Sequence, residues 1–134
     1  MQNRYIFDLS VLLEIAHGTE RGLAALKILK APENRIFTSE LIVAALYNVL
    51  ADRMGELEAT KCLSALIESK YFIIKKVDMI NIAKTAYKGN LSFVPASAIY
   101  LAQILDAIVI FSGIVRETFK DLEIDFPNLK IMFL

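Results

Sequence analysis

Polar residues that could do chemistry stand directly after the apolar segments of this sequence. If those segments are parallel strands, their carboxyl ends meet at one edge of a sheet, which is where α/β proteins bind ligands. Carboxylate and hydroxyl side chains at that edge are therefore the first candidates for a site. The residues at these positions are Asp8, Thr38, Ser39, Asp78, Ser112 and Gly113.

Several common catalytic motifs are absent from the sequence. The 5 glycines are scattered and form neither a GxGxxG loop nor a P-loop. No GxSxG element is present, and the single histidine, His17, excludes a paired-histidine zinc site. Cys62 is the only cysteine, so neither an intramolecular disulfide nor a thiolate metal cluster can form.

Length and composition favour one folded domain over residues 1–134. The chain is 56% hydrophobic, which excludes an intrinsically disordered protein. Its 15 basic and 15 acidic residues give zero formal net charge, which argues against a protein that coats nucleic acid by bulk electrostatics. The amino-terminal residues lack a basic stretch followed by a long apolar one, so we expect no signal peptide and a cytoplasmic protein.

Lysines are concentrated between positions 70 and 88. Such a concentration could follow a phosphate backbone, but an ordinary solvated surface is the favoured interpretation. The lysines are Lys70, Lys75, Lys76, Lys84 and Lys88.

The apolar stretch from 91 to 115 raises the question of a membrane. It is long enough to span a bilayer, but Asp106 lies inside it, where a charge costs about 3 kcal/mol. Pro95 and Gln103 weaken the stretch further. The pattern therefore favours a buried helix followed by a buried strand, divided at Asp106, with no membrane contact.

Segments with strand composition alternate with segments of helical periodicity. This alternation predicts parallel pairing with right-handed crossovers, and so a three-layer α/β/α sandwich. Ser10, Ser39 and Asp78 are the expected helix caps, and Pro95 is expected to begin the helix that continues from Ala96 to Leu105. A short helix is expected around 115–122. The expected strands are Tyr5–Phe7, Arg35–Thr38, Tyr71–Ile74, Ala107–Phe111 and Asn128–Phe133.

Taken in order, several segments of the chain resemble the PIN domain family. IFDLSVLLEIA, RIFTSELIVAALYNVL, LSFVPASAIYLAQILDAIVIFSG and DLEIDFPNL follow one another as in small prokaryotic VapC-type members. The resemblance covers essentially the whole chain and implies a parallel five-stranded sheet of order 3-2-1-4-5. PIN domains are typically Mg²⁺- or Mn²⁺-dependent ribonucleases, and many VapC-type members are toxins held in check by an antitoxin.

The family chemistry uses a converging cluster of carboxylates, because hard divalent cations take oxygen ligands and then polarise phosphate and water. By the resemblance, Asp8 matches the first acid, whereas Ala45 occupies the place of the second. Pro95 occupies the place of the third, and Ser112 or Gly113, depending on a one-residue choice of register, that of the fourth. A lone carboxylate binds Mg²⁺ poorly. We therefore expect a pseudoenzyme, with Asp8 as its one retained candidate metal ligand.

Other acidic residues could serve as substitutes only if they reach the same edge of the sheet. Glu40 lies about 500° around a helix from Ala45, so it is expected to stabilise the helix start instead. Asp106 precedes the fourth strand and is expected at the opposite end of the sheet. Glu117 and Asp121 are expected on a solvated helix face. Asp8 itself is either a remnant of the metal site or a cap for the following helix.

Two functions from different classes remain open. The first is a non-catalytic PIN-like module without a cofactor, acting through protein interaction or nucleic-acid binding as a homodimer. Its partner would be an antitoxin-like or other protein, or RNA. The alternative is an active VapC-type ribonuclease toxin that holds Mg²⁺ or Mn²⁺ with displaced acids. A third possibility is a resemblance to α/β sandwiches in general, and a strand order other than 3-2-1-4-5 would remove the family argument.

Overall fold

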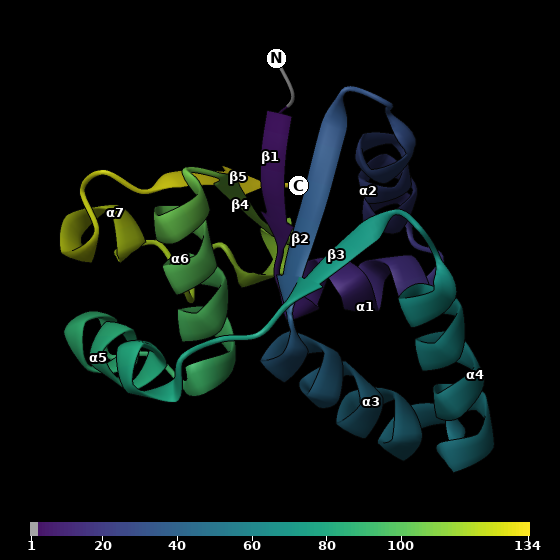
Figure 1. The fold of residues 1–134 in the computed structure, drawn as a ribbon. Helices are drawn as coiled ribbons and strands as arrows, with labels where there is room; N and C mark the ends of the chain where they lie inside the picture. The colour runs from purple at the N-terminus through teal and green to yellow at the C-terminus, as the bar shows by residue number, and fades with distance from the viewer. Residues whose placement is uncertain (1–2) are drawn as a thin grey trace.

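Parallel strands form the centre of the molecule in residues 3–134, which are the residues that this computed structural model describes (Figure 1). The sheet has 5 strands in the order β3-β2-β1-β4-β5, and every neighbouring pair is parallel. This confirms the expected order. The strands are β1 (Asn3–Phe7), β2 (Asn34–Ser39), β3 (Phe72–Lys75), β4 (Ile108–Phe111) and β5 (Lys130–Phe133).

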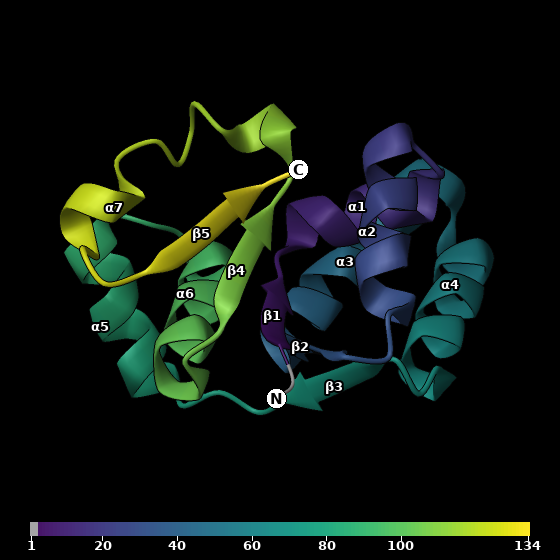
Figure 2. The ribbon, with the colours of Figure 1, turned by 90° about the horizontal axis from the view of Figure 1, so that it is seen from above.

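Helices cover both faces of this sheet, which confirms the three-layer α/β/α architecture. Figure 2 shows α1, α2 and α4 on one side and α5, α6 and α7 on the other. Helix α3 leaves the carboxyl end of β2 and packs against α4 and α6. The helices are α1 (Leu9–His17), α2 (Glu20–Lys30), α3 (Glu40–Met54), α4 (Glu56–Glu68), α5 (Met79–Gly89), α6 (Phe93–Leu105) and α7 (Leu122–Asp125).

The central strands are the apolar ones because helices bury both of their faces. Ile6 and Phe7 of β1 are completely buried, as are Val109, Ile110 and Phe111 of β4. In register, Ile6 lies between Phe37 and Val109, and Phe7 lies opposite Ile110. The edge strands β3 and β5 are half-buried and each carries one exposed lysine, which discourages edge-to-edge pairing between copies.

Most helix boundaries follow the expected caps, with one correction at α1. The hydroxyl of Ser39 accepts from the N–H of Ile42, and Asp78 accepts from the N–H of Ile80. Ser10, however, is not the cap of α1. Asp8 holds that position, and Ser10 lies inside the helix and donates its N–H to the Asp8 carboxylate. Asp8 is the cap because it lies where the extended strand turns into the helix, which is the position of a capping residue.

The stretch from 91 to 115 divides at Asp106, as expected. Helix α6 ends there, with Asp106 in the left-handed conformation at φ 49°, and β4 follows. The helix begins at Phe93 with Ser92 as its cap, so the prediction that Pro95 begins it was wrong. Pro95 still lies in the first turn, where a missing N–H costs no helical hydrogen bond. Among the described residues, no helix is long and apolar enough to cross a membrane.

The segment after β4 differs from the short helix expected over 115–122. A 3₁₀ turn covers Gly113–Val115, further turns follow, and α7 begins only at Leu122. The chain is held here by individual apolar anchors and not by a continuous helical face. Phe119 packs on Phe111 with ring centroids 4.6 Å apart, and Leu122 is buried.

Candidate functional site

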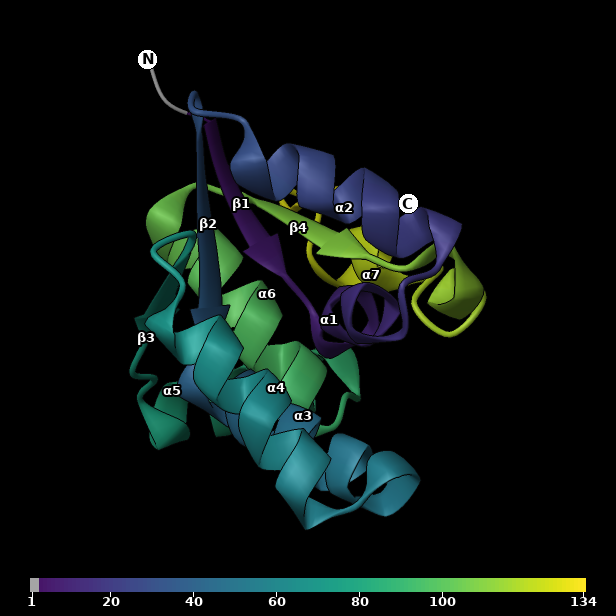
Figure 3. The ribbon, with the colours of Figure 1, turned by 90° about the vertical axis from the view of Figure 1, so that its right-hand side faces the viewer.

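Asp8 lies at the carboxyl end of the central strand β1, where the chain turns into α1 (Figure 3). Its backbone N–H donates to the carbonyl of Ile110 at 3.1 Å, which continues the ladder between β1 and β4. Its Oδ2 accepts the N–H of Ser10 at 3.0 Å and the Ser10 hydroxyl at 2.8 Å. The structure therefore bears out the cap interpretation of Asp8, and a cap does not exclude a second role for the other oxygen.

The second carboxylate oxygen of Asp8 has no partner. Oδ1 is the one buried side-chain N or O atom in residues 3–134 that makes no hydrogen bond, and the residue is only 4% exposed. Burial raises the pKa of the Asp8 carboxyl, because removal from water penalises the charged form, while the donors of Ser10 and the backbone N–H of Leu9 act in the opposite direction. Native proteins pair most buried polar atoms, so an unpaired carboxylate oxygen marks a candidate site.

A chain of hydrogen bonds connects Asp8 to Ser112 and Glu14. The Ser10 hydroxyl, which donates to Asp8, accepts the N–H of Ser112 at 3.0 Å. The Ser112 hydroxyl in turn donates to Glu14 Oε2 at 3.1 Å. The same Glu14 oxygen lies 3.8 Å from the guanidinium of Arg21. Two carboxylates therefore share one network, and an arginine partly neutralises the outer one.

The sequence reasoning missed Glu14. The signal that could have found it is its spacing from Ser10, since residues four apart share one face of a helix. Ser10 was placed next to Asp8 by the resemblance, so Glu14 one turn later faces the same edge of the sheet.

A pocket of about 390 Å³ adjoins Asp8 and Pro95, which places these two predicted site positions together. Its wall is mostly apolar, although the metal site of the resembled family would be acidic here. The lining residues are Asp8, Leu9, Ser10, Leu13, Ser92, Val94, Pro95, Val115 and Phe119.

Gly113 has no room for a side chain. Its N–H donates to the Leu134 carbonyl, and a Cβ at this position would meet the same oxygen at 2.5 Å. A side chain at position 113 would therefore displace Leu134, whereas position 112 already carries one. This is the reason to prefer Ser112 between the two registers left open by the sequence.

The remaining strand-end residues serve packing or lie elsewhere. Ser97 donates its proton to the Val94 carbonyl at 2.7 Å, so Ser39 must donate in the 2.8 Å contact between the two hydroxyls. This buried pair ties the start of α3 to α6. Thr38 is also fully buried and donates to the Phe7 carbonyl. Asp78 is exposed at the start of α5 and does not line the pocket.

Ala45, the remaining predicted position, lies half-buried in α3. It is not among the residues that line the pocket next to Asp8. Its place in the family's acid cluster stays a prediction.

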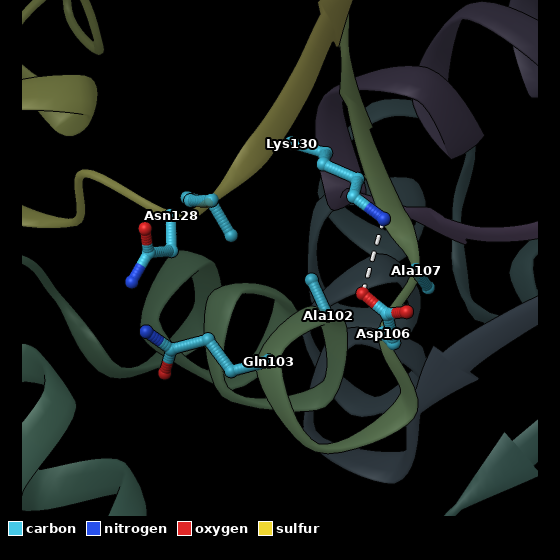
Figure 4. A pocket seen from close by; sticks show the side chains of 7 residues that line it. Ala102, Gln103, Asp106, Ala107, Asn128 and Lys130 are labelled. Atoms are coloured by element: carbon cyan, nitrogen blue, oxygen red, sulfur yellow. Dashed lines mark hydrogen bonds and ion pairs between the residues drawn. The ribbon is translucent and has the colours of Figure 1, made fainter.

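The acidic residues considered as substitutes do not join Asp8. Asp106 lies before β4, at the opposite end of the sheet, and pairs with Lys130 at 3.0 Å (Figure 4). Glu117 pairs with Lys120 at the surface, and Glu40 and Asp121 are exposed. Within residues 3–134, no three His, Cys, Asp or Glu side chains are grouped closely enough to hold a metal ion.

The lysines between positions 70 and 88 are all exposed, on or near β3 and α5. Lys75 lies 5.9 Å from the ring centre of Phe37, and Lys88 lies 5.1 Å from that of Phe126. These positions agree with a solvated surface. Contact with a phosphate backbone stays a prediction.

Comparison with known proteins gives structural matches and no sequence matches. No protein-family model and no curated protein matches the chain. The solved structure of VapBC2 from Rickettsia felis, bound to a DNA fragment from the promoter, matches with a TM-score of 0.73 and 14% identity over 98% of both chains. VapBC-1 from nontypeable Haemophilus influenzae matches with a TM-score of 0.67 and 13% identity over 97% of both chains.

A third structure is VapC20 from Mycobacterium tuberculosis, described as a toxin that cleaves the sarcin–ricin loop. It matches with a TM-score of 0.61 and 17% identity, over 78% of this chain and 86% of that one. The strand order agrees with these neighbours as well. This chain has the PIN fold. At these identities the likeness concerns the fold, and the site has to be judged from its own residues.

The residues next to Asp8 do not fit the divalent cation of PIN-fold ribonucleases. Mg²⁺ requires near-octahedral oxygen coordination and is held through carboxylates and water. Here Asp8 offers one free oxygen, and the facing wall consists of Val94, Pro95, Val115 and Phe119. Glu14, the other carboxylate of the network, is engaged by Ser112 and Arg21. We therefore derive no metal-dependent step for this site.

Proposed function

We propose that this protein is a non-catalytic PIN-fold module of one domain, residues 1–134, that acts by binding another macromolecule. The observation that carries the proposal is the apolar pocket beside Asp8, where a PIN nuclease would present several carboxylates. In the proposal, the neutral residues Ala45, Pro95 and Ser112 stand for lost metal ligands. Met1 and Gln2 of this domain lie outside the described residues.

The partner that we propose is an antitoxin-like protein, and the module acts as a cytoplasmic homodimer. Support comes from the structural neighbours, two of which are VapBC structures, and from apolar side chains at the surface. On α5, Tyr87 is 91% exposed and Ile80 69%. Leu57 and Ile67 on α4 are also exposed. Apolar residues at a surface favour protein contacts when they gather in a patch. Nucleic acid is the second candidate partner, through the lysines between 70 and 88.

The alternative function is a metal-dependent ribonuclease toxin with displaced acids. The observation in its favour is the network that joins Glu14 to Asp8 through Ser112 and Ser10. If Arg21 swung away, Glu14 would be the first acid available to share a cation with Asp8.

An RNA cleavage assay with Mg²⁺ and with Mn²⁺ separates the two functions. We expect no cleavage by the wild-type protein above that of the Asp8→Ala variant. The matched control is Asp78→Ala, which removes another aspartate cap that does not line the pocket. Cleavage that Asp8→Ala and Glu14→Gln abolish and that Asp78→Ala retains would establish the nuclease instead.

Rebuilding the acids tests the assignment of positions. The triple variant Ala45→Glu, Pro95→Asp, Ser112→Asp should bind Mn²⁺ at least about tenfold more tightly than the wild type, because carboxylates are the ligands that such cations prefer. Water-proton relaxation measures the binding. Equal Mn²⁺ affinity of the two proteins, with circular dichroism showing both folded, would contradict the assignment.

Light scattering of the wild-type protein tests the proposed homodimer. A mass that corresponds to a monomer at high protein concentration would contradict it.

A further inference from the structure

Helix α5 presents apolar side chains to solvent as well as to the core. Its inner face buries Ile82 and Ala86 against Ala96 of α6. Its outer face carries Ile80, which is 69% exposed, and Tyr87, which is 91% exposed. Two turns of helix separate these two side chains, so they lie along one stripe. The outer face of a surface helix is ordinarily polar, and an apolar stripe there indicates a contact surface.

Lysines accompany the apolar stripe of α5. Lys84 lies one turn after Ile80, and Lys88 lies one turn after Lys84, so the three side chains share the exposed side of the helix. Between positions 70 and 88 the only acid is Asp78, at the start of α5. In the part of the chain that the structure describes, no ion pair includes Lys84 or Lys88. The outer face of α5 therefore combines apolar surface with positive charge that the same molecule does not pair.

The opposite combination occurs in the segment 117–125, which includes α7. This segment is acidic apart from Lys120. Ile124 of α7 is 75% exposed, so an apolar side chain lies among the acids here as well. The acids of this segment that form no ion pair with another described residue are Asp121, Glu123 and Asp125.

Helices α5 and α7 lie next to each other on one flank of the molecule, away from α1, α2 and α4 (Figure 2). Lys88 at the end of α5 lies 5.1 Å from the ring centre of Phe126, which directly follows α7. A basic apolar surface thus adjoins an acidic apolar surface. When two copies of such a flank meet about a two-fold axis that passes between α5 and α7, each α5 faces the α7 of the other copy.

We propose that this flank binds a second copy of the chain, with α5 of each copy on α7 of the other. Ile80 and Tyr87 are then buried beside Ile124, and such apolar and aromatic side chains supply most of the binding free energy. The charges fix the orientation of the two copies. The inference rests on the proposed function, because it names the surface of the proposed homodimer. An acidic protein other than this chain would cover α5 and leave the acids of α7 unmatched.

Charge reversal on either segment tests this pairing. Sedimentation velocity of the full chain at low ionic strength measures the Kd of the dimer. The double variant Lys84→Glu, Lys88→Glu should raise this Kd at least about tenfold, because acids then face acids. The double variant Asp121→Lys, Glu123→Lys should raise it equally, because lysines then face lysines. An unchanged Kd for the α7 variant would overturn the proposal, since a dimer formed by α5 alone does not need these acids.

The matched control reverses two lysines of α2, which lies outside the proposed interface. Lys27→Glu, Lys30→Glu makes the same change of net charge on another exposed helix surface. It should leave the Kd of the dimer unchanged. A rise in Kd as large as that of the α5 variant would overturn the proposal, because net charge alone would then explain the effect.

The chain with all four substitutions on α5 and α7 separates the proposed pairing from other arrangements. Its α5 is acidic and its α7 segment is basic, so two copies match again with the charges exchanged. Its Kd should be at least about tenfold lower than that of either double variant. A contact of α5 with α5 predicts no such recovery. Absence of recovery in a chain that circular dichroism shows to be folded would overturn the proposal.

These measurements also keep the inference apart from the proposed function. A wild-type protein that stays monomeric would overturn both the homodimer and its interface. A dimer whose Kd none of the charge reversals changes would overturn the inference alone and leave the proposed homodimer in place. A weakening of the wild-type dimer by salt supports the inference, because salt screens exposed charges.

Discussion

Two aspartates cap helices in this protein and accept hydrogen bonds of similar length. Asp8 begins α1 and Asp78 begins α5, and each accepts the N–H of the residue two positions later at 3.0 Å. Each also accepts a second donor at 2.8 Å, from the Ser10 hydroxyl in one case and the Asn81 amide in the other. The two caps differ in one respect: both Ser10 donors reach Oδ2 of Asp8, whereas Ile80 and Asn81 donate to different oxygens of Asp78.

Their surroundings differ because they follow different strands. Asp8 follows β1 at the centre of the sheet and is buried among α1, α6 and the turn after β4, whereas Asp78 follows the edge strand β3 and is exposed. Only Asp8 has its charge removed from water, and its pKa is raised for that reason. The comparison teaches that an aspartate becomes a candidate site when its place in the sheet buries it and its cap hydrogen bonds leave one oxygen unpaired.

The largest difference in stability between the two caps should appear when the side chain that donates the 2.8 Å hydrogen bond is removed. Ser10→Ala takes one donor from the buried Asp8 carboxylate and leaves the N–H of Ser112 without its acceptor. We expect a loss of about 2–4 kcal/mol in the free energy of unfolding, since each unsatisfied buried group costs roughly 1–3 kcal/mol. Asn81→Ala removes the matching donor at the surface and should cost much less. Urea denaturation measures both, and equal losses would break the comparison.

A smaller effect should follow from neutralising Asp8. Because its pKa is raised in the folded state, Asp8 contributes stability that is fully present below the ordinary value of 3.8 and is lost as pH rises through the raised value. Asp8→Asn lacks this loss, and asparagine also caps helices well. We expect the variant to exceed the wild type by about 1–2 kcal/mol at pH 8.

The control for this pH dependence is Asp78→Asn, which should follow the wild-type curve from pH 4 to pH 8. Thermal unfolding at several pH values gives the comparison. A wild-type protein that gains stability over Asp8→Asn as pH rises would show that the carboxylate is charged and satisfied in the folded state.

The smallest effect is expected at the outer end of the Asp8 network. Arg21→Gln removes a contact of 3.8 Å to Glu14 and the hydrogen bond from Arg21 Nε to the Leu134 carbonyl at 3.2 Å, both made by a side chain that is 46% exposed. Ion pairs of this kind contribute below about 1 kcal/mol and weaken with salt. Urea denaturation at low and high salt measures the change. A loss above about 2 kcal/mol in the free energy of unfolding would exceed the contribution of a surface ion pair. It would mean that Arg21, Glu14 and Asp8 stabilise the fold as one buried network.

The architecture of this protein could be predicted from its sequence alone. Alternating apolar and helical segments predicted the parallel sheet, and the resemblance to PIN domains predicted the strand order. These features are local, because strand composition and helix caps such as Ser39 act within a few residues. The start of α1 was placed wrongly, since Asp8 and Ser10 are both good caps and only the turn of the backbone decides between them.

Only the tertiary structure decided the nature of the site. Helix α1 packs beside the end of β4, and this places Glu14 on Ser112, a contact between residues 98 positions apart. Val94, Val115 and Phe119 close an apolar wall around Asp8 from segments distant in the chain. The burial of a residue and the pairing of its charge depend on all the elements that pack around it. The sequence could therefore determine that Asp8 stands at the edge of the sheet, and the fold determined that one of its oxygens is left without a partner.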